Sequence, residues 1–260
     1  MLKQLICIAL MAFITLSAHA VALVSAGKII AADGQVAAIN VDKDTRPIKR
    51  GDDFYVMDTI KTEAASTVSL RFTDGTLLEL KENSAFEIKD YQFKQDAPQS
   101  DSYSSELIKG GFRTITGALG KRNPDHYDVQ ARMTTLTIRG TEYVLNIEQN
   151  GEVQVGLLQG GATVTAGGNA LYLTPNTNAV IHTDGHIVRG EGVPATMMHG
   201  YSSNNIDTLR TQSTRAGFTA NTSDNGQGTV FIEGQGASKP PAPVGSSSPC
   251  AGVAGMAGAM

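Results

Sequence analysis

TVSLRFTDGTLLEL, residues 67–80, contains two short runs of alternating apolar and polar residues that flank a turn. A two-residue turn at Asp74-Gly75 would place Leu70 opposite Glu79, which puts a charge on the apolar face of the strand pair. A three-residue loop instead places Leu70 opposite Leu78 and keeps the apolar side chains together. The hydrophobic pattern therefore predicts a hairpin with the longer loop, closed by a glycine in the left-handed conformation.

Similar patterns continue on both sides of this hairpin. Short β-branched or alternating runs are separated by Gly, Asp, Asn and Pro, and no stretch repeats apolar residues at helical spacing for three turns. The sequence thus predicts an all-β domain of short, mostly antiparallel strands and hairpins over residues 27–190. The runs lie at residues 35–40, 54–61, 67–72, 77–81, 85–90, 103–109, 112–116, 127–131, 134–139, 143–148, 153–158, 162–165, 170–174 and 179–182.

One break in the alternation falls at Arg139-Gly140. Apolar side chains occupy even positions before it, at Leu136 and Ile138, and odd positions after it, at Tyr143 and Leu145. A change of parity requires a bulge or an interruption of the strand, and glycine is the usual place for one. We therefore predict a bulge at this dipeptide.

Two short segments resemble each other weakly. Residues 107–111 read LIKGG and residues 157–161 read LLQGG. The Gly-Gly pair after an apolar run is typical of a turn, so each segment is interpreted as a strand–turn–strand unit. The similarity favours stacked β-turns.

Residues 1–20 have the organisation of a secretory signal sequence. Lys3 supplies the positive charge, an apolar stretch follows, and Ala18-His19-Ala20 forms a small-x-small cleavage site before Val21. We expect cleavage after Ala20 and export to the periplasm, which leaves no stable membrane span. The alternative is an uncleaved anchor in the inner membrane, because no formal charge occurs between Lys3 and Lys28.

The composition changes after residue 190. Residues 191–233 are expected to form a poorly ordered extension, with a short helix over residues 205–216 and an isolated strand over residues 229–232. Residues 234–260 are rich in Gly, Ala, Ser and Pro, which predicts a disordered tail with a solvated proline-rich spacer. Cys250 in this tail is interpreted as an unpaired, exposed thiol.

Composition and motif content exclude several classes of function. The formal net charge is −4, the isoelectric point is about 5.7 and tryptophan is absent, so no basic surplus is available to neutralise phosphates. A single cysteine after signal cleavage permits neither an internal disulfide nor a cysteine-based metal site. The chain also lacks a nucleophile elbow, a phosphate-binding loop, a dinucleotide fingerprint and an HExxH motif. We therefore expect no catalytic residues, no cofactor and no nucleic-acid partner.

His182, Asp184 and His186 are the best candidates for a metal site. On a straight strand, alternation would place all three side chains on one face. Asp184-Gly185 is also a strong turn signal, which favours a hairpin with one histidine on each side of its tip. The hairpin is the simpler interpretation, and we assign no metal ligands.

Charged residues within the strands offer further candidates. Two carboxylate pairs, Asp52 with Asp53 and Glu79 with Glu87, have the residue types that glycoside chemistry needs. The solvated faces of strands and turns explain these pairs more simply. Arginines in β-rich segments must satisfy five donors each, and they either tie down loop carbonyls or bind a ligand. These arginines are Arg113, Arg132 and Arg139.

Several separated motifs occur in the order in which they are found in one family. They are KRGD (49–52), DTIKT (58–62), FTDGT (72–76), LEL (78–80), KGGFR (109–113), TGALGKRNP (116–124) and TIRGTEY (137–143). Together they resemble the FecR family, over roughly residues 27–180. By this resemblance the domain is expected to be a bacterial, periplasm-facing β-domain built as a twisted, solenoid-like stack of strands.

The resemblance also implies a class of function. The best-known members relay occupancy of an outer-membrane siderophore receptor to a cytoplasmic sigma factor through a cytoplasmic helical segment and a membrane span. Only about four residues precede the apolar stretch here, so direct sigma-factor binding is not expected. We expect a non-enzymatic binding or signalling module that contacts a protein partner in the periplasm or envelope. The alternatives are an accessory structural or adhesin-like envelope protein and an enzyme acting on glycans.

Overall fold

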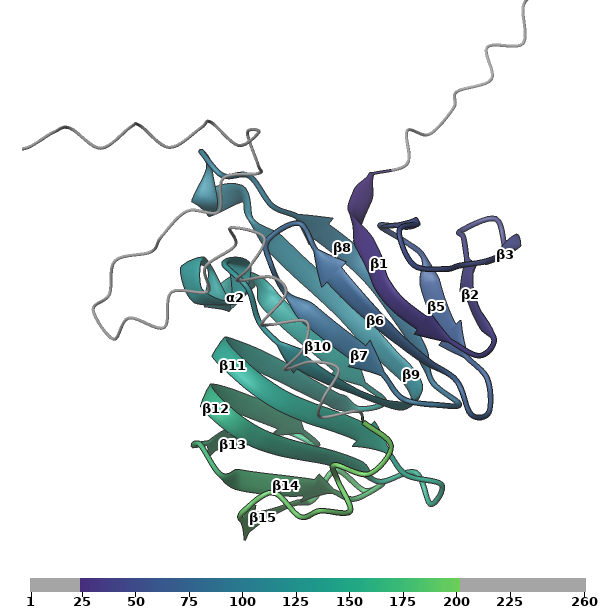
Figure 1. Cartoon of the computed structure of the whole chain (residues 1–260). Helices are drawn as coiled ribbons and strands as arrows, with labels where there is room; N and C mark the ends of the chain where they lie inside the picture. Colours follow the sequence, from purple (N-terminus) through teal and green to yellow (C-terminus); the bar gives the residue numbers. More distant parts are fainter. Residues whose placement is uncertain (1–23, 202–260) are drawn as a thin grey trace, which may run out of the picture.

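The computed structural model describes residues 24–201 and contains one open sheet of 15 strands (Figure 1). All strand pairs are antiparallel except β9 with β10, so the all-β fold predicted from the sequence is confirmed. The elements are β1 (Ser25–Asp33), β2 (Val36–Ile39), β3 (Thr45–Pro47), β4 (Asp53–Tyr55), β5 (Thr59–Thr62), β6 (Thr67–Phe72), β7 (Leu77–Leu80), β8 (Ala85–Gln92), η1 (Pro98–Ser100), β9 (Ser102–Ile115), α2 (Leu119–Arg122), η2 (Pro124–His126), β10 (Tyr127–Ala131), β11 (Thr134–Ile147), β12 (Val153–Ala166), β13 (Asn169–Leu173), β14 (Thr177–Ile181) and β15 (Ile187–Glu191). Within these residues no helix has the length and apolar character needed to cross a membrane.

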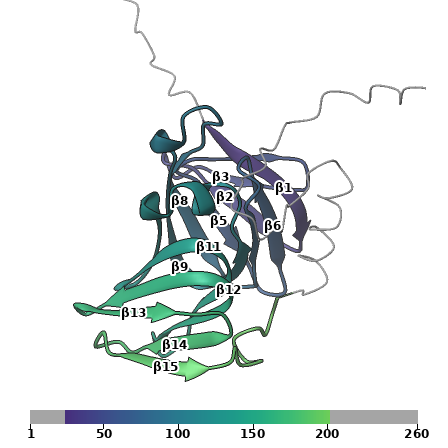
Figure 2. The same ribbon diagram turned by 90° about the vertical axis from the view of Figure 1, so that its left-hand side faces the viewer.

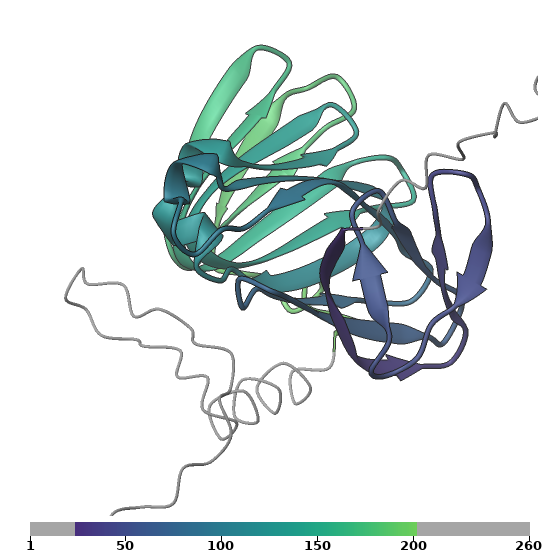
Figure 3. The same cartoon turned by 90° about the horizontal axis from the view of Figure 1, so that it is seen from above.

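The sheet folds back on itself into two facing layers (Figures 2 and 3). We call layer A the succession β4, β1, β6, β7, the second half of β9, the second half of β11, the first half of β12, β14 and β15. Layer B is the succession β3, β2, β5, β8, the first half of β9, β10, the first half of β11, the second half of β12 and β13. One continuous hydrophobic core contains buried residues of both layers.

Three long strands pass through both layers and bend at a glycine. β9, β11 and β12 change ladder partners at Gly110, Gly140 and Gly160, whose φ angles are +78°, +57° and +84°. Glycine reaches this left-handed region at little cost, so the chain turns the corner between layers without leaving the ladder. The sequence pattern divided each of these strands in two and interpreted residues 107–111 and 157–161 as turns. Both interpretations are wrong, because the Gly-Gly pairs bend continuous strands.

The bulge predicted at Arg139-Gly140 is confirmed. The register between β11 and β12 shifts between Arg139 and Glu142. Ile138 before the bulge and Tyr143 after it are both buried in the core between the layers. The bulge thus restores the apolar face of β11 after the corner.

The hairpin of residues 67–80 has the predicted register. Leu70 pairs with Leu78 across β6 and β7. The amide of Phe72 donates to the carbonyl of Thr76 at 2.9 Å, which closes the three-residue loop. Gly75 has a φ of +88°, as the longer loop requires.

Aromatic side chains join the two layers around Phe72. Its ring lies 5.3 Å from that of Tyr91 on β8 and 5.7 Å from that of Tyr103 on β9, so a side chain of layer A packs against two of layer B. Phe54 on β4 makes an edge-to-face contact with the same ring at 4.9 Å. Such contacts combine apolar burial with favourable ring geometry.

The strand predicted over residues 54–61 is in fact two strands, β4 and β5. A turn separates them, in which Met57 has a φ of +70°. The Asp58 carboxylate stabilises this turn, since it accepts hydrogen bonds from the Tyr55 amide at 2.8 Å and from Arg46 at 2.5 Å. Burial raises the pKa of Asp58, whereas these two hydrogen bonds lower it. The apolar residues through the turn conceal it in the sequence.

Residues 193–201, which we call the strap, cross the outer face of layer A. The side-chain amide of Asn146 on β11 donates to the Met197 carbonyl at 2.9 Å, and the Tyr201 hydroxyl donates to the same side chain at 2.5 Å. Met197 is buried. The segments predicted over residues 1–20, 205–216, 229–232 and 234–260 lie outside the described residues.

Candidate interaction site

The Asp74 carboxylate ties the 72–76 motif to the 116–124 motif. One of its oxygens accepts from the Thr76 amide at 3.0 Å, and the other accepts from the Thr76 hydroxyl at 2.9 Å and the Leu119 amide at 3.1 Å. The Tyr91 hydroxyl approaches it at 3.4 Å. Burial raises the pKa of this carboxyl, although each of these hydrogen bonds lowers it. Asp74 is fully enclosed, so it holds the loop and α2 together.

A second link joins the 116–124 motif to the 137–143 motif. The Thr116 amide donates to the Thr141 carbonyl at 2.9 Å, and the Thr141 amide donates to the Thr116 hydroxyl at 2.7 Å. Next to it, the Gly117 amide donates to the Thr76 hydroxyl at 2.9 Å. A Cβ on Gly117 would lie 2.4 Å from the Asp74 carbonyl oxygen, so only glycine fits at this contact. The three motifs therefore form one hydrogen-bonded unit.

The structure places the three candidate arginines apart. Arg113 is buried on the outer face of layer A, where its guanidinium donates to Glu142 at 2.5 Å. Arg139 is exposed beside the bulge. Arg132 forms the β10–β11 turn with a φ of +54°. Arg113 thus pairs with a carboxylate of the fold, which is neither of the two partners, loop carbonyls or a ligand, that the sequence suggested.

The candidate carboxylate pairs do not form acid–base sites. Asp52 accepts from the Lys49 amide at 2.9 Å and Asp53 pairs with Lys28 at 2.9 Å, so both stabilise loops and strands. Glu79 lies in layer A, whereas Glu87 lies on β8 in layer B. The expectation that Glu79 is solvated is wrong: it is fully buried, opposite a buried arginine in the ladder.

The hairpin interpretation of residues 182–186 is confirmed. The Gly185 amide donates to the His182 carbonyl at 2.9 Å, and the His186 amide donates to the Asp184 carboxylate at 2.9 Å, so these residues form the β14–β15 turn. His182 also contacts Glu152 at 2.6 Å. Across residues 24–201, no group of three or more His, Cys, Asp or Glu side chains is arranged to hold a metal ion.

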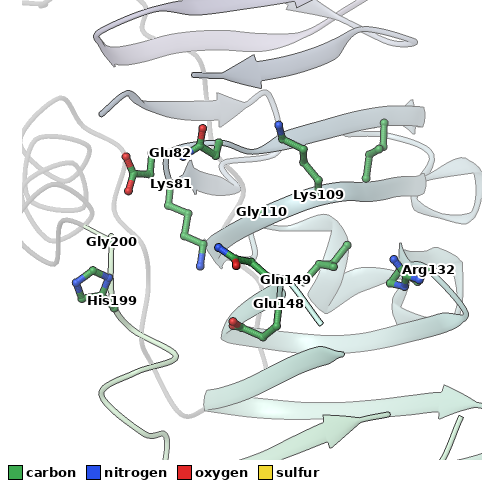
Figure 4. A pocket seen from close by; sticks show the side chains of 12 residues that line it. Lys81, Glu82, Lys109, Gly110, Arg132, Glu148, Gln149, His199 and Gly200 are labelled. Carbon is green, nitrogen blue, oxygen red and sulfur yellow. The ribbon is translucent and has the colours of Figure 1, made fainter. Parts of the chain in front are cut away.

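An open groove of about 460 Å³ lies at the corner where β9 bends (Figure 4). Lys81, Lys109 and Arg132 supply positive charge, and Glu82 and Glu148 supply negative charge. Burial lowers the pKa of Lys81, an effect that the two nearby carboxylates oppose. The groove thus combines charges of both signs with the apolar side chains of Ile108 and Ile147.

The free edges of the sheet provide a different kind of site. Among the described strands, β3, β4, β13 and β15 each pair on one side only. Natural sheets protect such edges with charges, proline or short strands. β3 carries Arg46 and Pro47, β4 is three residues long with Asp53, and β15 carries Arg189 and Glu191. β13 has five residues, NALYL, with neither charge nor proline, and is the unprotected edge.

β13 offers both backbone groups and an aromatic side chain. β13 follows the two-residue loop Gly167-Gly168. The residues on either side of this loop form a hydrogen-bonded pair, and such pairs alternate with non-hydrogen-bonded pairs along the hairpin. Ala170 and Tyr172 therefore point their N–H and C=O groups towards the free edge. The Tyr172 side chain is 56% exposed and lies over Gly161. The sequence analysis missed this site, although a glycine pair followed by an uncharged run was its signal.

Comparison with solved structures gives distant similarities. Two chains from Parabacteroides distasonis, both described as candidate anti-sigma factors, are each 14% identical, with TM-scores of 0.42 and 0.44. The aligned regions cover 52% and 60% of this chain, and 59% and 73% of those chains. A cell surface anchoring domain is 28% identical over 24% of this chain and 80% of that chain, with a TM-score of 0.23.

Comparison with protein families identifies the central part of the chain. No curated protein matches the sequence. The family model described as FecR protein matches residues 58–163, which include the three motifs that Asp74 and Thr116 join. Residues 58–163 are therefore similar to the FecR family, and they contribute strands to both layers of the β-fold described above.

Proposed function

We propose that this chain is an exported signalling module of the FecR type that acts by binding another protein outside the cytoplasm and has no catalytic role. The similarity of residues 58–163 to the FecR family supports a signalling or regulatory role. One observation carries the proposal further: the motif residues Asp74, Arg113, Thr116 and Thr141 each make hydrogen bonds to other residues of the fold. Because these residues build the scaffold, recognition belongs to the surfaces that the scaffold presents.

Export supports the choice of compartment. Residues 1–20 have the charge, apolar stretch and small residues of a cleavable signal. With cleavage after Ala20, the mature chain begins at Val21, shortly before β1 at Ser25. A protein released in this way requires a second protein to carry a signal across the inner membrane.

Crosslinking in intact cells tests this proposal. Lysine-reactive reagent is added to cells that produce the full chain, and mass spectrometry identifies both the N-terminus of the chain and the captured proteins. We expect a chain that begins at Val21 in a reproducible conjugate with an envelope protein. A chain that retains Met1 would instead support the anchored form. Recovery of the chain without any partner would contradict a binding function.

A further inference from the structure

The strap crosses the outer face of layer A in one direction. Its first residue packs against Gly156 on β12, and the Met197 carbonyl accepts a hydrogen bond from Asn146 on β11. At its end, the Tyr201 hydroxyl lies beside Gly111 on β9, the strand that pairs with β7. The chain thus advances from β12 over β11 to β9, and the last described residue lies next to the end of β7.

Three outward side chains near this point are buried. Leu77 and Glu79 on β7 and Arg113 on β9 alternate with residues of the core, so they point away from it. They are nevertheless only 7%, 0% and 6% exposed. The outer face of an antiparallel sheet commonly meets water, so burial this complete requires a cover on the outside of layer A.

The Arg113 guanidinium shows what this cover has to supply. Its Nη2 donates to Glu142, whereas Nε and Nη1 are buried and have no hydrogen-bond acceptor among residues 24–201. Burying a donor without an acceptor is unfavourable, and more so for a charged group. The cover therefore has to bring carbonyl, hydroxyl or amide oxygens to Arg113 as well as apolar contacts to Leu77.

We propose that residues 202–216 continue the strap and cover Leu77, Glu79 and Arg113 on the outer face of layer A. The strap ends at Tyr201 beside these side chains, so the next residues of the same chain are the nearest source of a cover. The proposal goes beyond the proposed function, because it concerns a contact within the chain. While the segment is in place, a partner protein cannot reach this part of layer A.

The segment has the reach and the side chains that this face requires. Leu77 lies four residues from Lys81, about 13 Å along an extended strand. Leu209 lies eight residues beyond Tyr201, about 12 Å along the helix expected there. Ile206 and Leu209 supply apolar contacts, and most of the remaining side chains carry the hydroxyl or amide oxygens that a buried guanidinium needs.

A photo-crosslinking residue in place of Leu209 tests the proposal in the purified chain with its complete C-terminus. The matched control carries the same probe in place of Val230, which is also an apolar residue beyond the strap. Each variant is mixed with an isotopically labelled copy before illumination, and mass spectrometry maps the conjugates. The label distinguishes a conjugate within one chain from a conjugate between two chains.

We expect the probe at position 209 to form conjugates within its own chain to β6, β7 or the second half of β9. Their yield should exceed that of the control at position 230 by at least about tenfold, since only a docked segment is held against these strands. Equal yields from both positions would overturn the proposal. So would conjugates that map to other strands or that join two copies of the chain.

Thiol labelling provides a second measurement that does not depend on the photo-probe. Leu77→Cys is compared with Val188→Cys on β15, where the native side chain is 42% exposed, and peptide mass spectrometry separates both sites from Cys250. We expect labelling at position 77 to be at least about tenfold slower than at position 188. Adding Leu209→Asp should remove this protection, whereas Val230→Asp should retain it. Equal labelling at positions 77 and 188, or protection that survives Leu209→Asp, would contradict the proposed cover.

Discussion

Asp74→Ala is expected to lower the free energy of unfolding by about 3 kcal/mol. The substitution leaves the Thr76 amide and hydroxyl and the Leu119 amide without their acceptor in a fully buried site. Each buried donor that loses its partner costs about 1–3 kcal/mol, and the neighbouring groups recover part of this by rearrangement. Equilibrium unfolding in urea measures the change.

Two further variants separate the role of this carboxylate from a general effect of removing an acidic residue. Asp74→Asn retains the size and one acceptor oxygen, so we expect a loss of about 1.5 kcal/mol. Asp125→Ala removes an exposed carboxylate in η2 and is expected to change stability by less than about 0.5 kcal/mol. Similar losses for Asp74→Ala and Asp125→Ala would show that Asp74 does not join the motifs.

Gly160→Ala is the second substitution with a large expected effect, again about 3 kcal/mol. A Cβ at this position would lie 2.3 Å from the Gly140 carbonyl oxygen and 2.8 Å from a methyl carbon of Thr141. The φ of +84° adds backbone strain. The bend of β12 at Gly160 therefore lies directly against the bend of β11 at Gly140, where both strands pass from one layer to the other.

Gly168→Ala provides the matched control for the corner. Its φ is +80°, close to that of Gly160, but nothing lies within 4 Å of an added Cβ. It should therefore report backbone strain alone, about 1 kcal/mol. Thermal unfolding of both variants gives the comparison. Equal losses of thermal stability in the two variants would show that the corners of β11 and β12 do not approach closely at Gly160.

Hydrophobic alternation was sufficient to predict local pairing. The register of residues 67–80 and the bulge at Arg139-Gly140 followed from keeping apolar side chains on one face. The continuity of β9, β11 and β12 did not follow, because Gly110 and Gly160 end an alternating run whether the chain turns back or bends into the next layer. Only the ladder partners, far away in sequence, distinguish these outcomes.

The sequence was also insufficient to give the roles of the candidate residues. Asp74 and Leu119 are 45 residues apart, and only the folded sheet brings them together. Glu79 lies opposite Arg113 and is buried, which no local pattern of charges indicates. The unprotected edge of β13 depends on which strands lie at the ends of the sheet, and the order of strands in space was not predicted.

Amide hydrogen exchange in the purified mature chain tests the central claim most directly, namely that β13 is an open edge. The Leu171 amide pairs with β12, whereas the amides of Ala170 and Tyr172 face the free edge of β13. We predict that Ala170 and Tyr172 exchange at least about tenfold faster than Leu171. Equal protection of all three amides would contradict the account, because the edge of β13 would then already be paired.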